Sequence, residues 1–168
     1  MVHPLVEQLH FTRKEFLRGL KGLTDEDARK RFLPMNCISW NVGHLAWHEQ
    51  RYWLTFMQDR TPMPEINSLV GYGQPASTPP LDQMLDAWHK LTAASDEYLH
   101  QLTSTSILEP FLSKGKATQH SIASRLQRVI YHYWYHTGEN LAIRQMLGHT
   151  GLPEFVGNIE KEAPYRPG

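Results

Sequence analysis

The sequence predicts an all-α protein, a four-helix bundle with a long crossover loop between the second and third helices. Apolar residues recur at helical spacing in four separate segments, and no segment shows the alternation typical of a β-strand. Prolines and glycines gather between the second and third of these segments. The 168 residues are expected to form one domain, residues 1–168, with an irregular tail at 149–168 packed on the bundle.

The first two helices are predicted over residues 5–20 and from Ser39 to about residue 58. In the first, Leu5, Leu9, Phe16 and Leu20 form an apolar stripe among charged residues. Ser39 is a residue type that favours an N-cap position. The second helix carries aromatic residues nearly all the way round, so we expect it to be heavily buried.

Residues 60–80 contain seven prolines and glycines that make a helix there implausible: Pro62, Pro64, Gly71, Gly73, Pro75, Pro79 and Pro80. Thr78 followed by Pro79 favours the start of a third helix, which extends to about residue 102. Ser121 is expected to cap the fourth helix, and Gly148 to end it. The inward-facing stripe of the fourth helix is predicted to be Val129, His132, His136, Ile143 and Met146.

Composition excludes several classes of protein. Lys plus Arg and Asp plus Glu both number 17, and no basic run indicates a nucleic-acid partner. No apolar run approaches the roughly 18 residues that span a bilayer, and residues 1–5 lack the pattern of a signal peptide. Cys37 is the single cysteine, which excludes a thiolate-rich metal site. We therefore expect a cytoplasmic protein without nucleic-acid or membrane partners.

Two pairs of histidines have the spacing of one helical turn. His132 and His136 lie four residues apart on the predicted inward stripe, and His44 and His48 repeat this spacing in the second helix. Buried imidazoles need partners for both ring nitrogens, and a divalent metal ion can accept a lone pair from each neutral ring. We expect one histidine of the earlier pair to join His132 and His136, although such pairs also arise by chance as core or surface residues. A metalloprotease would have Glu after the first histidine, whereas this chain has Tyr133.

Two motifs resemble those of the DinB family. They are Trp40-x-x-Gly43-His44-x-x-Trp47-x-Glu49, and His132-x-x-x-His136-x-Gly138-Glu139 followed by Ile143-Arg144-x-x-Leu147-Gly148. The family consists of four-helix-bundle proteins described as metal-dependent enzymes, and the predicted helices agree with it in order and spacing. The resemblance implies a divalent metal ion, often nickel or zinc, held by His44, His132 and His136.

Two further residues are candidate catalytic groups. Members of the family usually have Gln where this chain has Glu139, one helical turn from His136. Glu139 can act as a general base, as an acceptor that orients His136, or as one member of a structural ion pair. His48 can be a fourth ligand, a group that contacts the ligands, or a residue at the mouth of the site.

Three histidines leave a coordination position open, which is typical of catalytic metal sites. The resemblance implies thiol-dependent transfer or isomerisation of a small-molecule substrate, with a low-molecular-weight thiol as a second component; hydrolysis is the other chemistry that fits. The alternative is a non-catalytic binding or stress-response protein whose metal is structural or absent. Tyr133, Trp134 and Tyr135 cannot all face inward, so we expect some of them to form a homodimer contact.

Overall fold

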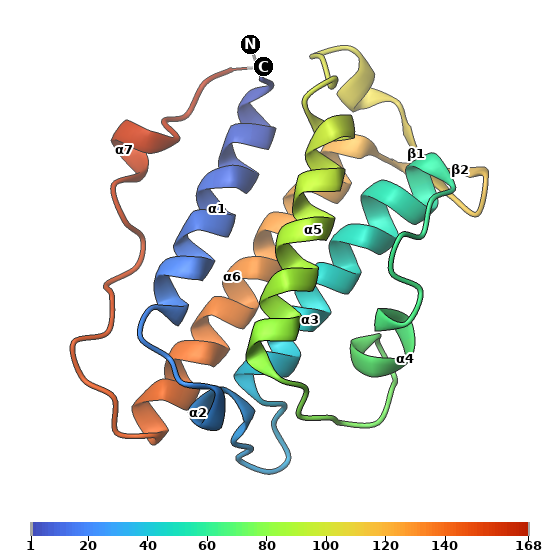
Figure 1. Cartoon of the computed structure of the whole chain (residues 1–168). Coiled ribbons are helices and arrows are strands. Elements are labelled where there is room, and N and C mark those ends of the chain that lie inside the picture. Colours follow the sequence, from blue (N-terminus) through green and yellow to red (C-terminus); the bar gives the residue numbers. More distant parts are fainter. Residues whose placement is uncertain (1, 168) are drawn as a thin grey trace.

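The computed structural model describes residues 2–167 and is mostly helical, which confirms the all-α prediction in its general form. Figure 1 shows the elements in chain order. They are α1 (Pro4–Leu20), α2 (Asp25–Arg29), α3 (Ile38–Glu49), the π-helix η1 (Gln50–Phe56), α4 (Ile66–Val70), α5 (Leu81–Leu99), the 3-10 helix η2 (Ser106–Leu108), β1 (Pro110–Ser113), β2 (Lys116–Ser121), α6 (Ile122–Met146) and α7 (Ile159–Glu162).

The long helices pack around a common apolar core. Helix α3 packs mainly against α5, α1 packs mainly against α6, and α3 also contacts α6 (Figure 1). Large side chains from all of these elements are fully buried, among them Leu9, Phe16, Leu45, Trp53, Leu91 and Leu126. Burial of this apolar surface is the main force that holds the helices together.

A buried polar network also connects the four long helices. Arg13 of α1 donates from Nε and Nη2 to the two carboxylate oxygens of Glu49 in α3, each at 2.8 Å. The hydroxyl of Tyr133 in α6 donates to Glu49 Oε1 at 3.0 Å, and Trp88 Nε1 of α5 donates to the Tyr133 oxygen at 2.8 Å. Burial, and then the Glu49 charge, raises the pKa of Tyr133 well above its ordinary value. The tyrosine is therefore a neutral donor within the network.

The N-cap of α3 is Cys37, and the prediction of Ser39 was wrong. The thiol of Cys37 accepts a hydrogen bond from the Trp40 backbone N–H at 3.4 Å. Ser39 lies inside the helix, where its hydroxyl donates to the carbonyl of Pro79 at 2.5 Å. The Ser39 hydroxyl is therefore bonded to the Pro79 carbonyl, which is distant in sequence, and does not cap the backbone of its own helix.

Helix α5 begins two residues later than predicted. Its N-cap is Pro80 rather than Thr78, and the Asp25 carboxylate of α2 accepts from the Leu81 N–H at 2.8 Å. The predicted ends of α6 are confirmed, because Ser121 accepts from the Ser124 N–H and Gly148 adopts a φ of +82° just beyond the helix. Met146 was wrongly placed on the inward stripe, since 54% of it is exposed.

Residues 60–80 are not entirely a loop, because they contain α4. Ile66 and Val70 on this short helix are buried against the core, and they anchor the segment. Gln50, at the start of η1, holds the chain before α4 by accepting from the Met63 N–H at 2.7 Å and donating to the Met63 carbonyl at 3.0 Å. The segment is therefore fixed against both α3 and η1.

Strands β1 and β2 form an antiparallel hairpin that the sequence did not predict. Lys114 and Gly115 have φ values of 52° and 71° at its tip, as a two-residue turn requires. The hairpin lies at one end of the long helices and α2 at the other (Figure 1). Phe111 of β1 is buried, with its ring centroid 5.3 Å from that of Tyr52.

The predicted tail, residues 149–167 of the described chain, is irregular apart from α7. It runs along the outer side of α1 (Figure 1). The Glu15 carboxylate accepts from the Gly157 N–H at 2.9 Å, and the side chain of Gln8 donates to the Ala163 carbonyl. Across residues 2–167, no helix has the combination of length and apolar character needed to cross a membrane.

Candidate metal centre

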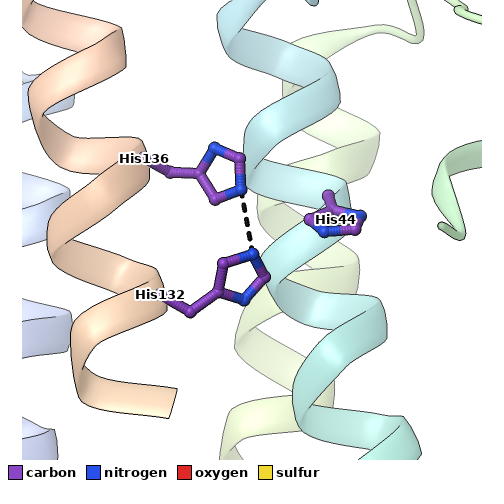
Figure 2. A group of neighbouring side chains, drawn as sticks. All are labelled: His44, His132 and His136. Atoms are coloured by element: carbon purple, nitrogen blue, oxygen red, sulfur yellow. Dashed lines mark hydrogen bonds between the residues drawn. The ribbon is translucent and has the colours of Figure 1, made fainter. Parts of the chain in front are cut away.

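Helices α3 and α6 bring three histidines together. His44 projects from α3 toward His132 and His136, which lie one turn apart on α6 (Figure 2). Each ring offers one nitrogen, and these atoms all lie within 4.8 Å of one another. The group contains the three histidines that the family resemblance implies as ligands.

His44 is fixed by aromatic stacking and by a backbone carbonyl. Its ring stacks on Trp40, with centroids 4.5 Å apart, and on Trp47 at 5.1 Å. Its Nδ1 lies 2.8 Å from the carbonyl oxygen of Val70, the last residue of α4. Since a carbonyl only accepts, Nδ1 carries the proton and Nε2 of the neutral ring keeps a free lone pair.

Glu139 orients His136. Its Oε2 lies 2.8 Å from His136 Nδ1, and the same oxygen accepts from Asn41 Nδ2 at 2.9 Å. Asn41 also donates to Asn140 Oδ1 at 2.8 Å, which joins α3 to α6 beside the histidines. Since a carboxylate only accepts, Nδ1 of His136 carries a proton, and Nε2 is the ring nitrogen that faces the other histidines.

The Nε2 atoms of His132 and His136 face each other at 3.0 Å (Figure 2). Burial, and then the neighbouring His136 charge, lowers the pKa of His132 to about 3. Burial lowers the pKa of His44 to about 4. Both rings are therefore neutral at neutral pH and have lone pairs available. His132 Nδ1 is buried and has no hydrogen-bond partner within residues 2–167.

This donor set fits a divalent metal ion. The hydrogen bond between His132 and His136 uses one lone pair, but three neutral imidazoles have more lone pairs than this group supplies donors. Burying such lone pairs without a partner is costly, and a cation that accepts them removes the cost. The hydrogen bonds of His44 to Val70 and of His136 to Glu139 are the outer contacts that commonly orient ligating histidines. The three histidines can hold such an ion.

His48 is buried beside this group but does not belong to it. Its ring centroid lies 4.4 Å from that of His132 and 4.2 Å from that of Tyr52. Burial, then His132 and His44, and then Arg51 and Arg128 lower its pKa well below the ordinary value. Its Nδ1 is buried without a hydrogen-bond partner in the described chain.

A cavity of about 820 Å³ opens next to the histidines. His44, His48 and His132 form part of its wall. The remaining wall comes from Trp47 of α3, from η1, the loop after α4, the β-hairpin and the first half of α6. The cavity therefore borders two of the three histidines of the group, His44 and His132.

A second group of metal-ligating side chains, His10, Asp96 and His100, fits a metal less well. Asp96 Oδ1 accepts from Arg13 Nη1 at 2.7 Å and lies 3.1 Å from His10 Nε2. Burial alone would raise the pKa of Asp96, but the His10 hydrogen bond and the Arg13 charge outweigh it and lower the pKa. The carboxylate already has cationic and hydrogen-bonded partners.

Two contributors to the site escaped the sequence analysis. The Val70 carbonyl is a backbone group, and no residue type indicates it. Asn41 lies one turn before His44 and is fully buried. The available indication in the sequence was a polar residue on a helix that is expected to be heavily buried. Its partner Glu139 was identified as a candidate, with its role left open between base, orienting acceptor and ion pair.

Comparison with known proteins identifies the family of the chain. None of the curated proteins compared with the chain matches it. A model of the DinB superfamily matches residues 8–139, a range that includes α3, the histidine group and Glu139. Because this match covers well over half of the 168 residues, the chain belongs to the DinB superfamily.

Proposed function

We propose that this protein is a metal-dependent enzyme that acts on a small molecule. His44, His132 and His136 would hold one divalent ion, and zinc or nickel suits three imidazole ligands. The observation that carries the proposal is the convergence of three histidine nitrogens within 4.8 Å of one another, at the wall of a cavity. A structural site would be expected to close the coordination shell with protein atoms instead.

The residues around the histidines would have different roles in the reaction. Glu139 keeps His136 in the tautomer that binds a metal, which favours the orienting role over that of a general base. His48 lines the cavity beside His132, with one ring nitrogen unpaired, and would exchange a hydrogen bond or a proton with the substrate. The bound metal would supply Lewis-acid chemistry by lowering the pKa of a thiol or water that ligates it.

The reaction proposed is transfer or hydrolysis, with a low-molecular-weight thiol or water as the nucleophile. The cavity of about 820 Å³ has room for both a substrate and a small thiol. Aromatic side chains in its wall, such as Trp47 and Phe111, exclude water and favour an apolar portion in the bound molecule.

The proposal extends to the architecture and the assembly. We interpret α1, α3 with η1, α5 and α6 as a four-helix bundle in which residues 60–80 form the crossover. A homodimer would use exposed aromatic residues on α6, where Tyr131 and Tyr135 are 67% and 70% exposed. Light scattering during size-exclusion chromatography tests the dimer. The cytoplasmic location and the lack of a nucleic-acid partner stay predictions.

Metal analysis of protein purified without a His tag tests the centre. We expect about one zinc or nickel ion per chain, and His136→Ala should reduce this to background. His120→Ala is the matched control, because His120 is exposed on β2 and lies outside the histidine group. A chain without stoichiometric metal, unchanged by His136→Ala, would refute the enzyme proposal and leave the non-catalytic alternative.

Chelation separates a catalytic metal from a structural one. An open catalytic centre predicts a small change in thermal stability after metal removal, because the apolar core already holds the helices. A large loss of thermal stability would instead indicate a structural metal.

A further inference from the structure

The cavity beside the histidines carries an excess of positive charge. Three arginines line it, Arg51 from η1 and Arg125 and Arg128 from α6, and no aspartate or glutamate does. Within residues 2–167, none of the three forms an ion pair. Three uncompensated guanidinium groups on one concave wall attract anions.

Arg125 is held in place by aromatic rings rather than by a carboxylate. Its guanidinium carbon lies 5.3 Å from the Phe111 ring centroid and 5.7 Å from that of Tyr52. Its Nε is buried and has no hydrogen-bond partner in the described chain. A buried guanidinium donor without an acceptor is costly, and an oxyanion in the cavity would supply the acceptor.

Arg51 and Arg128 place further positive charge close to the histidines. The guanidinium carbon of Arg51 lies 5.2 Å from the ring centroids of both Trp47 and Phe56. Arg128 lies one turn before His132 on α6 and lines the cavity together with His48 and His132. The arginines therefore share one cavity with the proposed metal centre.

We propose that Arg51, Arg125 and Arg128 form an oxyanion-binding wall, and that the substrate of this site is a small anion bearing a carboxylate or phosphate next to an apolar or aromatic part. The guanidinium fork matches the oxygens of both groups. The aromatic rings against which Arg51 and Arg125 lie would contact the apolar part. As an assignment of substrate class, this inference rests on the proposed function; as a statement about anion binding, it can be tested separately.

Ligand-observed NMR titrations with metal-free protein provide the test. The probes are benzoate, phenyl phosphate and the neutral analogue benzamide. We expect both anions to bind at least tenfold more tightly than benzamide, and this preference to weaken as NaCl screens the charges. The stronger of the two anions identifies carboxylate or phosphate as the preferred group.

Arginine variants locate the binding. Arg51→Gln and Arg128→Gln each remove an exposed side chain and should weaken anion binding about tenfold, the usual size for a charge-assisted hydrogen bond. Arg125→Lys keeps the charge and the packing stem but loses the fork, so it should also weaken binding. Arg60→Gln is the control, because Arg60 is exposed on the outside of the cavity and its loss should have no effect. Circular dichroism confirms that each variant is folded.

Three results would overturn the inference: benzamide binding as well as the anions, anion affinity unchanged by Arg51→Gln and Arg128→Gln, or anion binding seen with zinc-loaded protein alone. Zinc titration of the same samples keeps the two proposals apart. A chain that binds the anions through arginines but takes up no zinc refutes the metal centre and leaves the anion site. A chain that takes up zinc but shows no preference for anions refutes the anion site and leaves the metal centre.

Discussion

The Nδ1 atom of His136 lies 2.8 Å from Oε2 of Glu139, one turn further along α6. Asn41 of α3 donates to the same carboxylate oxygen at 2.9 Å, so Glu139 is itself held by the neighbouring helix. The position of His136 in the candidate centre thus depends on a contact between α3 and α6, the two helices that supply the histidines. We therefore expect Glu139 and Asn41 to contribute to metal affinity, although neither residue is a proposed metal ligand.

Removing the Glu139 carboxylate should weaken metal binding while leaving the fold intact. We expect Glu139→Ala to lower zinc affinity by about 10- to 100-fold, the usual effect of losing a group that orients a ligating histidine. Glu139→Gln keeps an acceptor for the Nδ1 proton and should have a smaller effect. A competition titration against a chelator measures both affinities, with Gln145→Ala, exposed on the same helix, as the control. Equal affinity in Glu139→Ala and wild type would show that the carboxylate does not position His136.

Gly43 allows α3 to approach its neighbours closely just before His44. A Cβ at this position would overlap with Met84 Sδ and lie 3.2 Å from both methyl groups of Val70. We expect Gly43→Ala to destabilise the protein by about 1–3 kcal/mol, the usual cost of overpacking. It should also weaken zinc binding, because displacing Val70 moves the carbonyl that fixes His44.

Gly138→Ala provides a matched comparison for the previous substitution. Gly138 also lies inside a helix, but nothing lies within 4 Å of an added Cβ. Alanine there should raise the free energy of unfolding by about 0.4–1 kcal/mol, because it restricts the unfolded chain. Urea-induced unfolding measures both variants. If both substitutions changed the free energy of unfolding in the same direction, this would contradict the close approach inferred at Gly43.

The histidine group could be predicted from sequence because its geometry is local. Residues four apart share a helical face, and an apolar stripe directs that face inward, so His132 and His136 had to meet whatever lies opposite on α3. Spacing alone left His44 and His48 as equal candidates. The family resemblance singled out His44, and the structure brings His44 to the group and leaves His48 beside it.

The surroundings of the histidines could not be predicted because they depend on tertiary contacts. Helix α4 was missed because Pro62 and Pro64 suggest a loop, yet both prolines precede the helix and do not interrupt it. The hairpin was missed because its strands are largely exposed and lack an alternating apolar pattern. The hairpin and the loop after α4 form part of the cavity wall, so the sequence indicated the histidine group better than it indicated the space beside it.

The buried pair of Arg13 and Glu49 should be far more sensitive to mutation than the ion pairs on the surface. Their side chains are 5% and 0% exposed, so Arg13→Met leaves the Glu49 carboxylate buried without its cation. We expect a loss of about 3–5 kcal/mol in the free energy of unfolding. Lys90→Met removes an exposed pair with Asp86 and should change stability by less than about 1 kcal/mol. Similar losses in urea-induced unfolding of the two variants would contradict a buried, mutually dependent pair.

Asp96 should contribute stability that disappears in acid. Hydrogen bonding to His10 and the charge of Arg13 outweigh the effect of burial and lower the pKa of Asp96 below its ordinary value of 3.8. Because the folded state binds the proton less readily than the unfolded chain, the contribution is fully present above the ordinary pKa and is lost as pH falls through the lowered one.

The difference in free energy of unfolding between wild type and Asp96→Asn should therefore be largest near pH 7 and shrink below about pH 4. Urea-induced unfolding at a series of pH values measures this difference. Asp86→Asn, which removes an exposed carboxylate of the same helix, is the control substitution. A difference for Asp96→Asn that stays constant from neutral to acidic pH would mean that Arg13 and His10 do not favour the charged carboxylate.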